Sequence, residues 1–200
     1  MTITIFLGSM LAAMALDMFA VLFGGAVAML PAFIDEILQG SPENLGLLRA
    51  APAIGSVLAG AWLARHPLQR HEGRYLLGAI AGFGIAVIGF GWSTSFGLAA
   101  TFLFFTGVFD AISVVVRSTI LQLMTPDQMR GRISAINGIF IGSSNEIGAL
   151  ESGLAASALG LSTSIVFGGV MTLLVVVVCW FAAPKLRELE IADLHDVRKH

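Results

Sequence analysis

The sequence carries little charge and no excess of basic residues. Charged residues make up 12% of the 200 residues and hydrophobic residues 56%, whereas a typical soluble domain has about 25% charged residues. The formal net charge is −2, so no strong basic field indicates a nucleic-acid partner. This composition excludes an ordinary soluble domain and is typical of an integral membrane protein.

The residues that build disulfides and metal sites are equally scarce. The one cysteine, Cys179, cannot form an internal disulfide and is expected to pack as a small hydrophobe. The four histidines have no HxxxH-type spacing and no acidic cluster beside them. We therefore predict no metal and no cofactor, and we regard a membrane enzyme as the least favoured function.

The apolar residues fall into segments long enough to cross a membrane. A helix needs about 20 apolar residues to span the hydrocarbon core. Runs such as LLVVVVCWF lack the alternation that marks the strands of a membrane barrel. The predicted fold is an all-α integral membrane bundle over 1–183, followed by a charged tail over 184–200. Six spans are predicted, over 8–33, 45–65, 74–93, 97–124, 132–159 and 161–183.

The connections between these segments differ in charge. Asp35, Glu36 and Glu43 lie in the connection between the first two segments. The arginines lie in the connections after the second and fourth segments, at Arg65, Arg70, Arg74, Arg130 and Arg132. The positive-inside rule then places these basic loops, and both termini, in the cytoplasm. Because Met1 leads almost directly into an apolar segment, we expect a further segment upstream.

Two of the predicted spans share a short pattern. Asp17 interrupts the first segment within MALDMFA, and Asp110 interrupts the fourth within GVFDAIS. Transporters are often built from three-helix repeats of inverted topology, in which the first and fourth helices correspond. We therefore predict two inverted three-helix repeats.

Charged side chains inside a span indicate function, because each costs about 2.5–3.5 kcal/mol near the bilayer centre on insertion scales. Asp110 and Arg117 are seven residues apart, so they lie on one face of a helix and roughly 10 Å apart along its axis. We expect Asp110 to face a cavity. Arg117 either extends to the membrane surface or contacts a ligand, and Asp17 is either a coupling site or a water-accessible or paired acid.

The fifth segment contains IFIGSSNEIGALESG, with polar residues on two faces. Asn137, Ser144 and Glu151 recur at seven-residue intervals and form one stripe. Glu146 lies about 140° around the helix from Glu151. One face is expected to line an aqueous cavity and the other to pack on neighbouring helices. The spacing does not decide which glutamate faces the cavity.

The sequence also predicts close helix contacts, helix distortions and one possible ion pair. Small residues let membrane helices approach closely, so close contacts are predicted at Gly138, Gly142, Gly148 and Gly153, and weakly at Gly78 and Gly82. Pro31 and Pro52 are expected to kink or end a helix. Arg49 is a possible ion-pair partner for Glu151.

Several segments resemble the major facilitator superfamily. TPDQMRGRISAIN is similar to the loop after the tenth helix of that family, and GAWLARHPLQRHEGR resembles its Gly- and Arg-rich loop between the eighth and ninth helices. LDMFAVLFGGAVAMLP, LGLLRAAPAIGSVLAG and IGSSNEIGALESG resemble the branch that contains the enterobactin (siderophore) exporter and drug-efflux proteins. The resemblance covers nearly the whole chain, as the C-terminal half of a twelve-helix carrier.

This resemblance implies alternating access in a bacterial inner membrane, with the first and fourth helices lining a central cavity. Proton-driven export of a small organic compound is the implied function, with Asp17, Asp110, Glu146 and Glu151 as candidate contacts for protons or substrate. The implied partners are the substrate, protons, membrane lipid, and a missing N-terminal six-helix half or a second copy. The loop motifs comprise Arg65, Arg70, Arg74, Arg130, Gly131 and Arg132. The alternative is a membrane fragment or scaffold that transports nothing.

Overall fold

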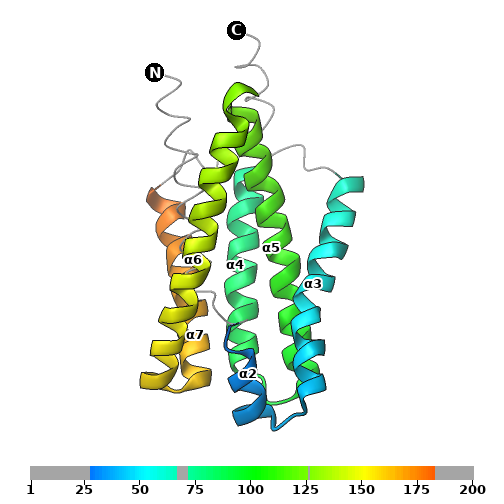
Figure 1. Cartoon of the computed structure of the whole chain (residues 1–200), viewed down its shortest axis with the longest axis vertical. Coiled ribbons are helices and arrows are strands. Elements are labelled where there is room, and N and C mark those ends of the chain that lie inside the picture. The colour runs from blue at the N-terminus through cyan, green and yellow to red at the C-terminus, as the bar shows by residue number, and fades with distance from the viewer. Residues whose placement is uncertain (1–27, 67–71, 126, 183–200) are drawn as a thin grey trace.

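The structure is a computed structural model that describes residues 28–66, 72–125 and 127–182. These residues form α-helices and two short segments of π and 3-10 helix, with no strand among them (Figure 1). The prediction of an all-helical chain is therefore confirmed for the described residues. Asp17, Arg70 and the tail over 184–200 lie outside them.

Five long helices run alternately in opposite directions (Figure 1). They correspond to the five predicted segments from 45–65 onward. Their bounds are α3 Pro42–Arg65, α4 Glu72–Gly91, α5 Phe96–Met124, α6 Arg130–Leu159 and α7 Leu161–Ala182. Gly160, with a φ of 84°, provides the tight turn between α6 and α7.

Four of the described helices are long and apolar enough to span a membrane. The apolar segments are Glu43–Arg65, Gly73–Gly91, Phe96–Gln122 and Leu161–Phe181. Helix α6 has 30 residues and is therefore roughly 45 Å long, but it does not belong to this group. The reason is its polar content, because Asn137, Glu146 and Glu151 interrupt its apolar residues. The segment predicted as a span over 132–159 is therefore helical, but its hydropathy is too low for it to count among the candidate membrane spans.

Helical structure also extends beyond the predicted end of the first segment. The short helix α2, Leu30–Phe33, continues directly into a π-helix, η2, over Ile34–Leu38. Gln39 then adopts a left-handed conformation with a φ of 46°. Pro31 lies in the first turn of α2, where its missing N–H has no helical partner to lose. The expectation that Pro31 kinks or ends the predicted first helix stays a prediction, because residues 1–27 lie outside the described part of the chain.

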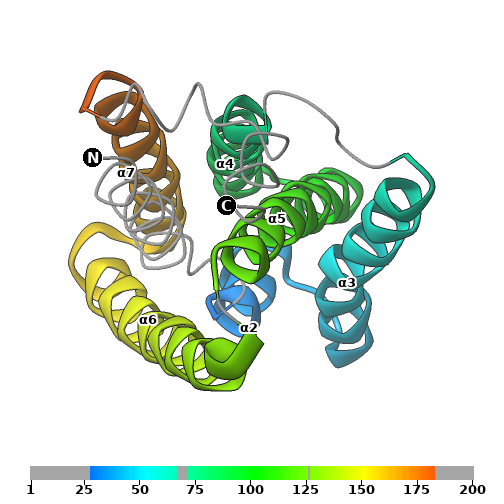
Figure 2. The same ribbon diagram turned by 90° about the horizontal axis from the view of Figure 1, so that it is seen from above.

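Helix α4 occupies the centre of the described bundle. It packs against α5 on one side and α7 on the other, while α3 packs on α5 and α6 packs on α7. Figure 2 shows the result, with α3 and α6 on opposite flanks. The bundle thus holds α6 mainly through α7 within the described part of the chain.

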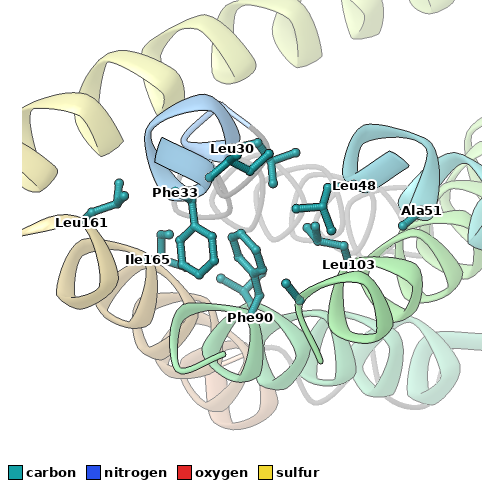
Figure 3. Close-up of a cluster of buried hydrophobic side chains, with 11 residues drawn as sticks. Leu30, Phe33, Leu48, Ala51, Phe90, Leu103, Leu161 and Ile165 are labelled. Carbon is teal, nitrogen blue, oxygen red and sulfur yellow. The ribbon is translucent and has the colours of Figure 1, made fainter. Parts of the chain in front are cut away.

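An apolar cluster ties the helices together at the end where α2 lies (Figure 3). The rings of Phe33 and Phe90 are 4.4 Å apart between centroids, at an angle of 35°. Around them lie the other buried residues of the cluster: Leu30, Ile34, Leu48, Ala51, Val87, Ala99, Leu103, Leu161 and Ile165. Because these residues come from α2, η2, α3, α4, α5 and α7, the cluster fixes α2 under the bundle.

A second cluster fills the bundle nearer its other end. It joins α4, α5 and α7, and its buried members are Leu76, Leu77, Ile80, Val116, Ile120 and Val176. Outside the clusters, many large apolar side chains are exposed, including Val57 on α3 and Phe181 on α7. In a membrane chain such side chains meet lipid or another protein rather than water.

The closest helix contacts are made by glycines. A Cβ atom on Gly107 of α5 would overlap the carbonyl of Pro52 in α3, and one on Gly55 would overlap the carbonyl of Phe104. The hydroxyl of Ser56 donates a hydrogen bond to the Gly107 carbonyl at 2.9 Å. The backbones of α3 and α5 therefore meet directly, as small residues permit in membranes.

A second backbone contact joins α4 to α7. A Cβ atom on Gly169 would lie 2.8 Å from the carbonyl oxygen of Gly84, and one on Gly84 would lie 3.1 Å from that of Gly169. By contrast, a Cβ atom on Gly138, Gly142 or Gly153 of α6 would meet nothing within 4 Å. The predicted close packing at these three glycines is wrong, because no atom of a neighbouring described helix lies within 4 Å of where their side chains would begin.

Candidate functional site

Helix α5 carries a polar stripe that begins one turn before Asp110. Thr106, Asp110, Ser113 and Arg117 follow one another at intervals of four, three and four residues, which places them on one side of a helix. Thr106, Ser113 and Arg117 are buried, whereas Asp110 is exposed. Asp110 and Arg117 are sequence-predicted site residues. Thr106 and Ser113 are not among the predictions, although their spacing from Asp110 in the sequence indicates the same side of the helix.

Arg117 lies inside the bundle rather than at its surface. Only 6% of the residue is exposed, so its side chain is covered by the protein. A buried cation is costly unless the protein supplies compensating polar groups. Its position on the stripe with Ser113 is consistent with a role in the interior of the protein.

Several hydroxyls in the described helices donate to a carbonyl of their own helix. Thr106 donates to the carbonyl of Leu103 at 2.6 Å, and Thr172 donates to that of Gly168 at 3.0 Å. Such bonds give a hydroxyl a partner inside an apolar helix. Two bonds instead cross between helices, from Ser56 to Gly107 and from Ser164 to the carbonyl of Ser152 at 3.2 Å.

The structure separates the two glutamates of α6. Ser144, Gly148 and Ser152 are buried on the side of α6 that faces the bundle. Glu151 lies beside them and is partly buried, whereas Glu146 is exposed. Asn137, also on the predicted stripe, is partly buried. The stripe of Asn137, Ser144 and Glu151 thus lies on the inner side of α6.

The suggested pair of Arg49 and Glu151 does not form. Within the described residues no ion pair joins them, because α3 and α6 lie on opposite flanks of the bundle (Figure 2). Arg49 is exposed in the second turn of α3. The predicted pairing is wrong because helical spacing does not determine which helices are neighbours.

The described loop arginines gather at one end of the molecule. Arg65 ends α3, Arg74 lies in the first turn of α4, and Arg130 and Arg132 begin α6. The alternating helix directions place these residues at the opposite end from Asp35, Glu36 and Glu43 (Figure 1). Gly131 is exposed with open space around it. The two ends of the bundle therefore carry opposite charge.

No metal centre is present in the part of the chain that the structure describes. Over residues 28–66, 72–125 and 127–182, no three His, Cys, Asp or Glu side chains come close enough to hold an ion. The polar groups within α5 and α6 include carboxyls, the guanidinium of Arg117, hydroxyls and the amides of Asn137 and Asn145. These groups can bind a polar solute or carry a proton across a membrane.

The fold and these groups define a multi-pass membrane protein with ionisable residues inside its helices. The sequence pattern of the Major Facilitator Superfamily matches residues 5–199, so the chain belongs to that family of transporters. Members of this family bind small-molecule substrates and are generally not enzymes. No curated protein matches the chain.

Proposed function

We propose that this chain forms half of a proton-coupled exporter for a small organic compound such as a siderophore or a drug. The observation that carries the proposal is the stripe of α5, where an exposed carboxyl at Asp110 lies on the same side as buried Arg117. An ionisable residue inside a membrane helix is a default candidate for a substrate or proton pathway. We assign Asp110 to proton exchange with the central cavity of the assembled carrier.

Glu151 is the second proposed member of the pathway. It lies on the inner side of α6 beside buried Ser144 and Ser152, whereas Glu146 is exposed about 140° away. We assign Glu151 to proton or substrate contact. Glu146 is assigned to the surface that meets the second half of the carrier.

A second six-helix unit completes the proposed carrier. Asp110 and Glu146 are exposed although both lie in the middle of long helices, and a lipid-facing charge is strongly disfavoured. A second unit that covers these positions would remove that cost. Either an N-terminal half or a second copy of the chain serves this role, with the basic loops in the cytoplasm of a bacterial inner membrane.

Transport into inside-out membrane vesicles tests this function. Vesicles that contain the chain with its second unit are given an imposed pH gradient, and the uptake of siderophores and lipophilic drugs is measured. Asp110→Asn is expected to lose gradient-driven uptake. The matched control is Glu43→Gln, which changes an exposed acid in the first turn of α3 and is expected to retain uptake. Normal uptake by Asp110→Asn, with normal insertion, would refute the assignment.

A further inference from the structure

A groove opens between α4 and α5, beside the polar stripe. Its volume is about 460 Å³. It is lined by Arg74, Tyr75, Gly78 and Ala79 of α4, and by Phe109 and Ile112 of α5. Four of these six residues are apolar or lack a side chain, and the two polar ones lie next to each other. The groove is therefore apolar along its length and polar at one end.

Glycines define the floor and the closed end of this groove. A Cβ atom on Gly78 would meet nothing within 4 Å, so the space above this residue is open. One turn further, a Cβ atom on Gly82 would lie 2.6 Å from the ring of Phe109. The Phe109 ring therefore closes the groove, whose lining extends roughly 8 Å along α4 from Arg74 to Ala79.

The open end of the groove is basic. Arg74 and Tyr75 are exposed in the first turn of α4, at the end of the bundle that also carries Arg65, Arg130 and Arg132 (Figure 1). Tyrosine is enriched at membrane interfaces, and basic residues there attract anionic lipid headgroups. The open end thus has the chemistry of the headgroup region.

This groove is separate from the proposed transport pathway. Phe109 and Ile112 lie about 100° and about 160° around α5 from Asp110, because each residue advances an α-helix by 100°. Phe109 is four residues before Ser113, so the groove adjoins the stripe there. No stripe residue and no carboxyl group belongs to the groove lining.

We propose that the groove binds one acyl chain of an anionic phospholipid, with the lipid phosphate on Arg74 and the headgroup beside Tyr75. Charge complementarity selects an anionic headgroup, and the apolar floor at Gly78 and Ala79 selects a hydrocarbon chain rather than a free anion. The bound lipid fills the space between α4 and α5 near the basic end. This proposal goes beyond the transport function and does not depend on it.

Lipid retention by the purified full chain tests the proposal. The protein is exchanged into mixed micelles that contain phosphatidylglycerol and phosphatidylcholine, and bound lipids are counted by native mass spectrometry. Arg74→Gln is expected to weaken retention of phosphatidylglycerol about 5-fold, since one basic side chain near the surface contributes about that factor. The matched control Arg65→Gln, at the exposed last residue of α3, is expected to change it little.

A second pair of variants tests the acyl-chain part. Gly78→Leu places a side chain into the groove and is expected to reduce binding of both lipids. Gly60→Leu, at another open glycine, serves as the control, and Gly78→Ala should give a smaller reduction with an intact fold. Equal lipid retention by Arg74→Gln and Arg65→Gln, or by Gly78→Leu and Gly60→Leu, would overturn the proposal. So would displacement of the lipid by glycerophosphoglycerol, the headgroup without chains, as effectively as by the intact lipid.

Discussion

Gly107 in α5 lies directly against the carbonyl group of Pro52 in α3, with no side chain between the two backbones. This contact places α3 on α5 and fixes the direction of the polar stripe that begins at Thr106. The expected kink at Pro52 does not end the helix, which continues to Arg65.

Replacing Gly107 by alanine is expected to destabilise the protein. The added methyl group must displace the Pro52 backbone, and overpacking of this kind costs about 1–3 kcal/mol. The change in unfolding free energy in detergent checks this. The matched control is Gly97→Ala, at an open position in the same helix, which should leave stability within about 1 kcal/mol of the parent. Equal stability of the two variants would contradict the α3–α5 contact.

The contact between α4 and α7 leads to a similar expectation. Gly169→Ala brings a methyl group to 2.8 Å from the Gly84 carbonyl oxygen and is expected to cost about 1–2 kcal/mol. Gly138→Ala on α6 has open space and should be neutral or stabilising by up to about 1 kcal/mol, because alanine favours helix. Thermal unfolding of both variants distinguishes them. A Gly138→Ala variant that is the less stable of the two would show that α6 is packed differently.

The aromatic pair under the bundle is expected to contribute strongly to stability. Phe90→Ala removes a fully buried ring that lies 4.4 Å from the ring of Phe33, and such truncations cost about 3–5 kcal/mol. Phe181→Ala provides the control, because 77% of Phe181 is exposed. Comparison of the two unfolding transitions gives the measurement, and similar losses would mean that the cluster around α2 does not hold the helices together.

The two glutamates of α6 are expected to behave differently in transport. Glu151→Gln removes the proposed proton carrier on the inner side of the helix, and gradient-driven uptake should be lost. Glu146→Gln changes an exposed carboxyl and should retain uptake. Both variants are assayed in vesicles at matched protein levels. If Glu146→Gln alone lost uptake, the proposed roles would have to be exchanged.

Several features of the candidate site follow from helical spacing alone. Residues seven apart lie on one side of a helix, so the stripe that joins Asp110 to Arg117 could be predicted. So could the angle between Glu146 and Glu151. Spacing relates residues on one helix to each other, however, and does not say which side meets a neighbour. The inner position of Glu151 therefore required the structure.

Contacts between helices were the least predictable feature. Arg49 and Glu151 carry opposite charges, but they do not form the predicted ion pair because α3 and α6 are not neighbours. The glycines of α6 have the spacing of a packing motif, yet the contacts form at Gly107 and Gly169 instead. A close approach needs small residues at matching heights on two helices, and a single helix sequence contains only half of that information.

The glycines of this chain consequently fall into two populations with different tolerance to mutation. A saturation scan should find that Gly55 and Gly107 accept no other residue, whereas Gly46, Gly60 and Gly97 accept many, because the second group has open space where a side chain would begin. The number of glycines in the chain therefore overstates how many of them hold helices together. The tolerant positions are also suitable attachment points for spectroscopic labels, through which movement of individual helices can be followed without disturbing the bundle.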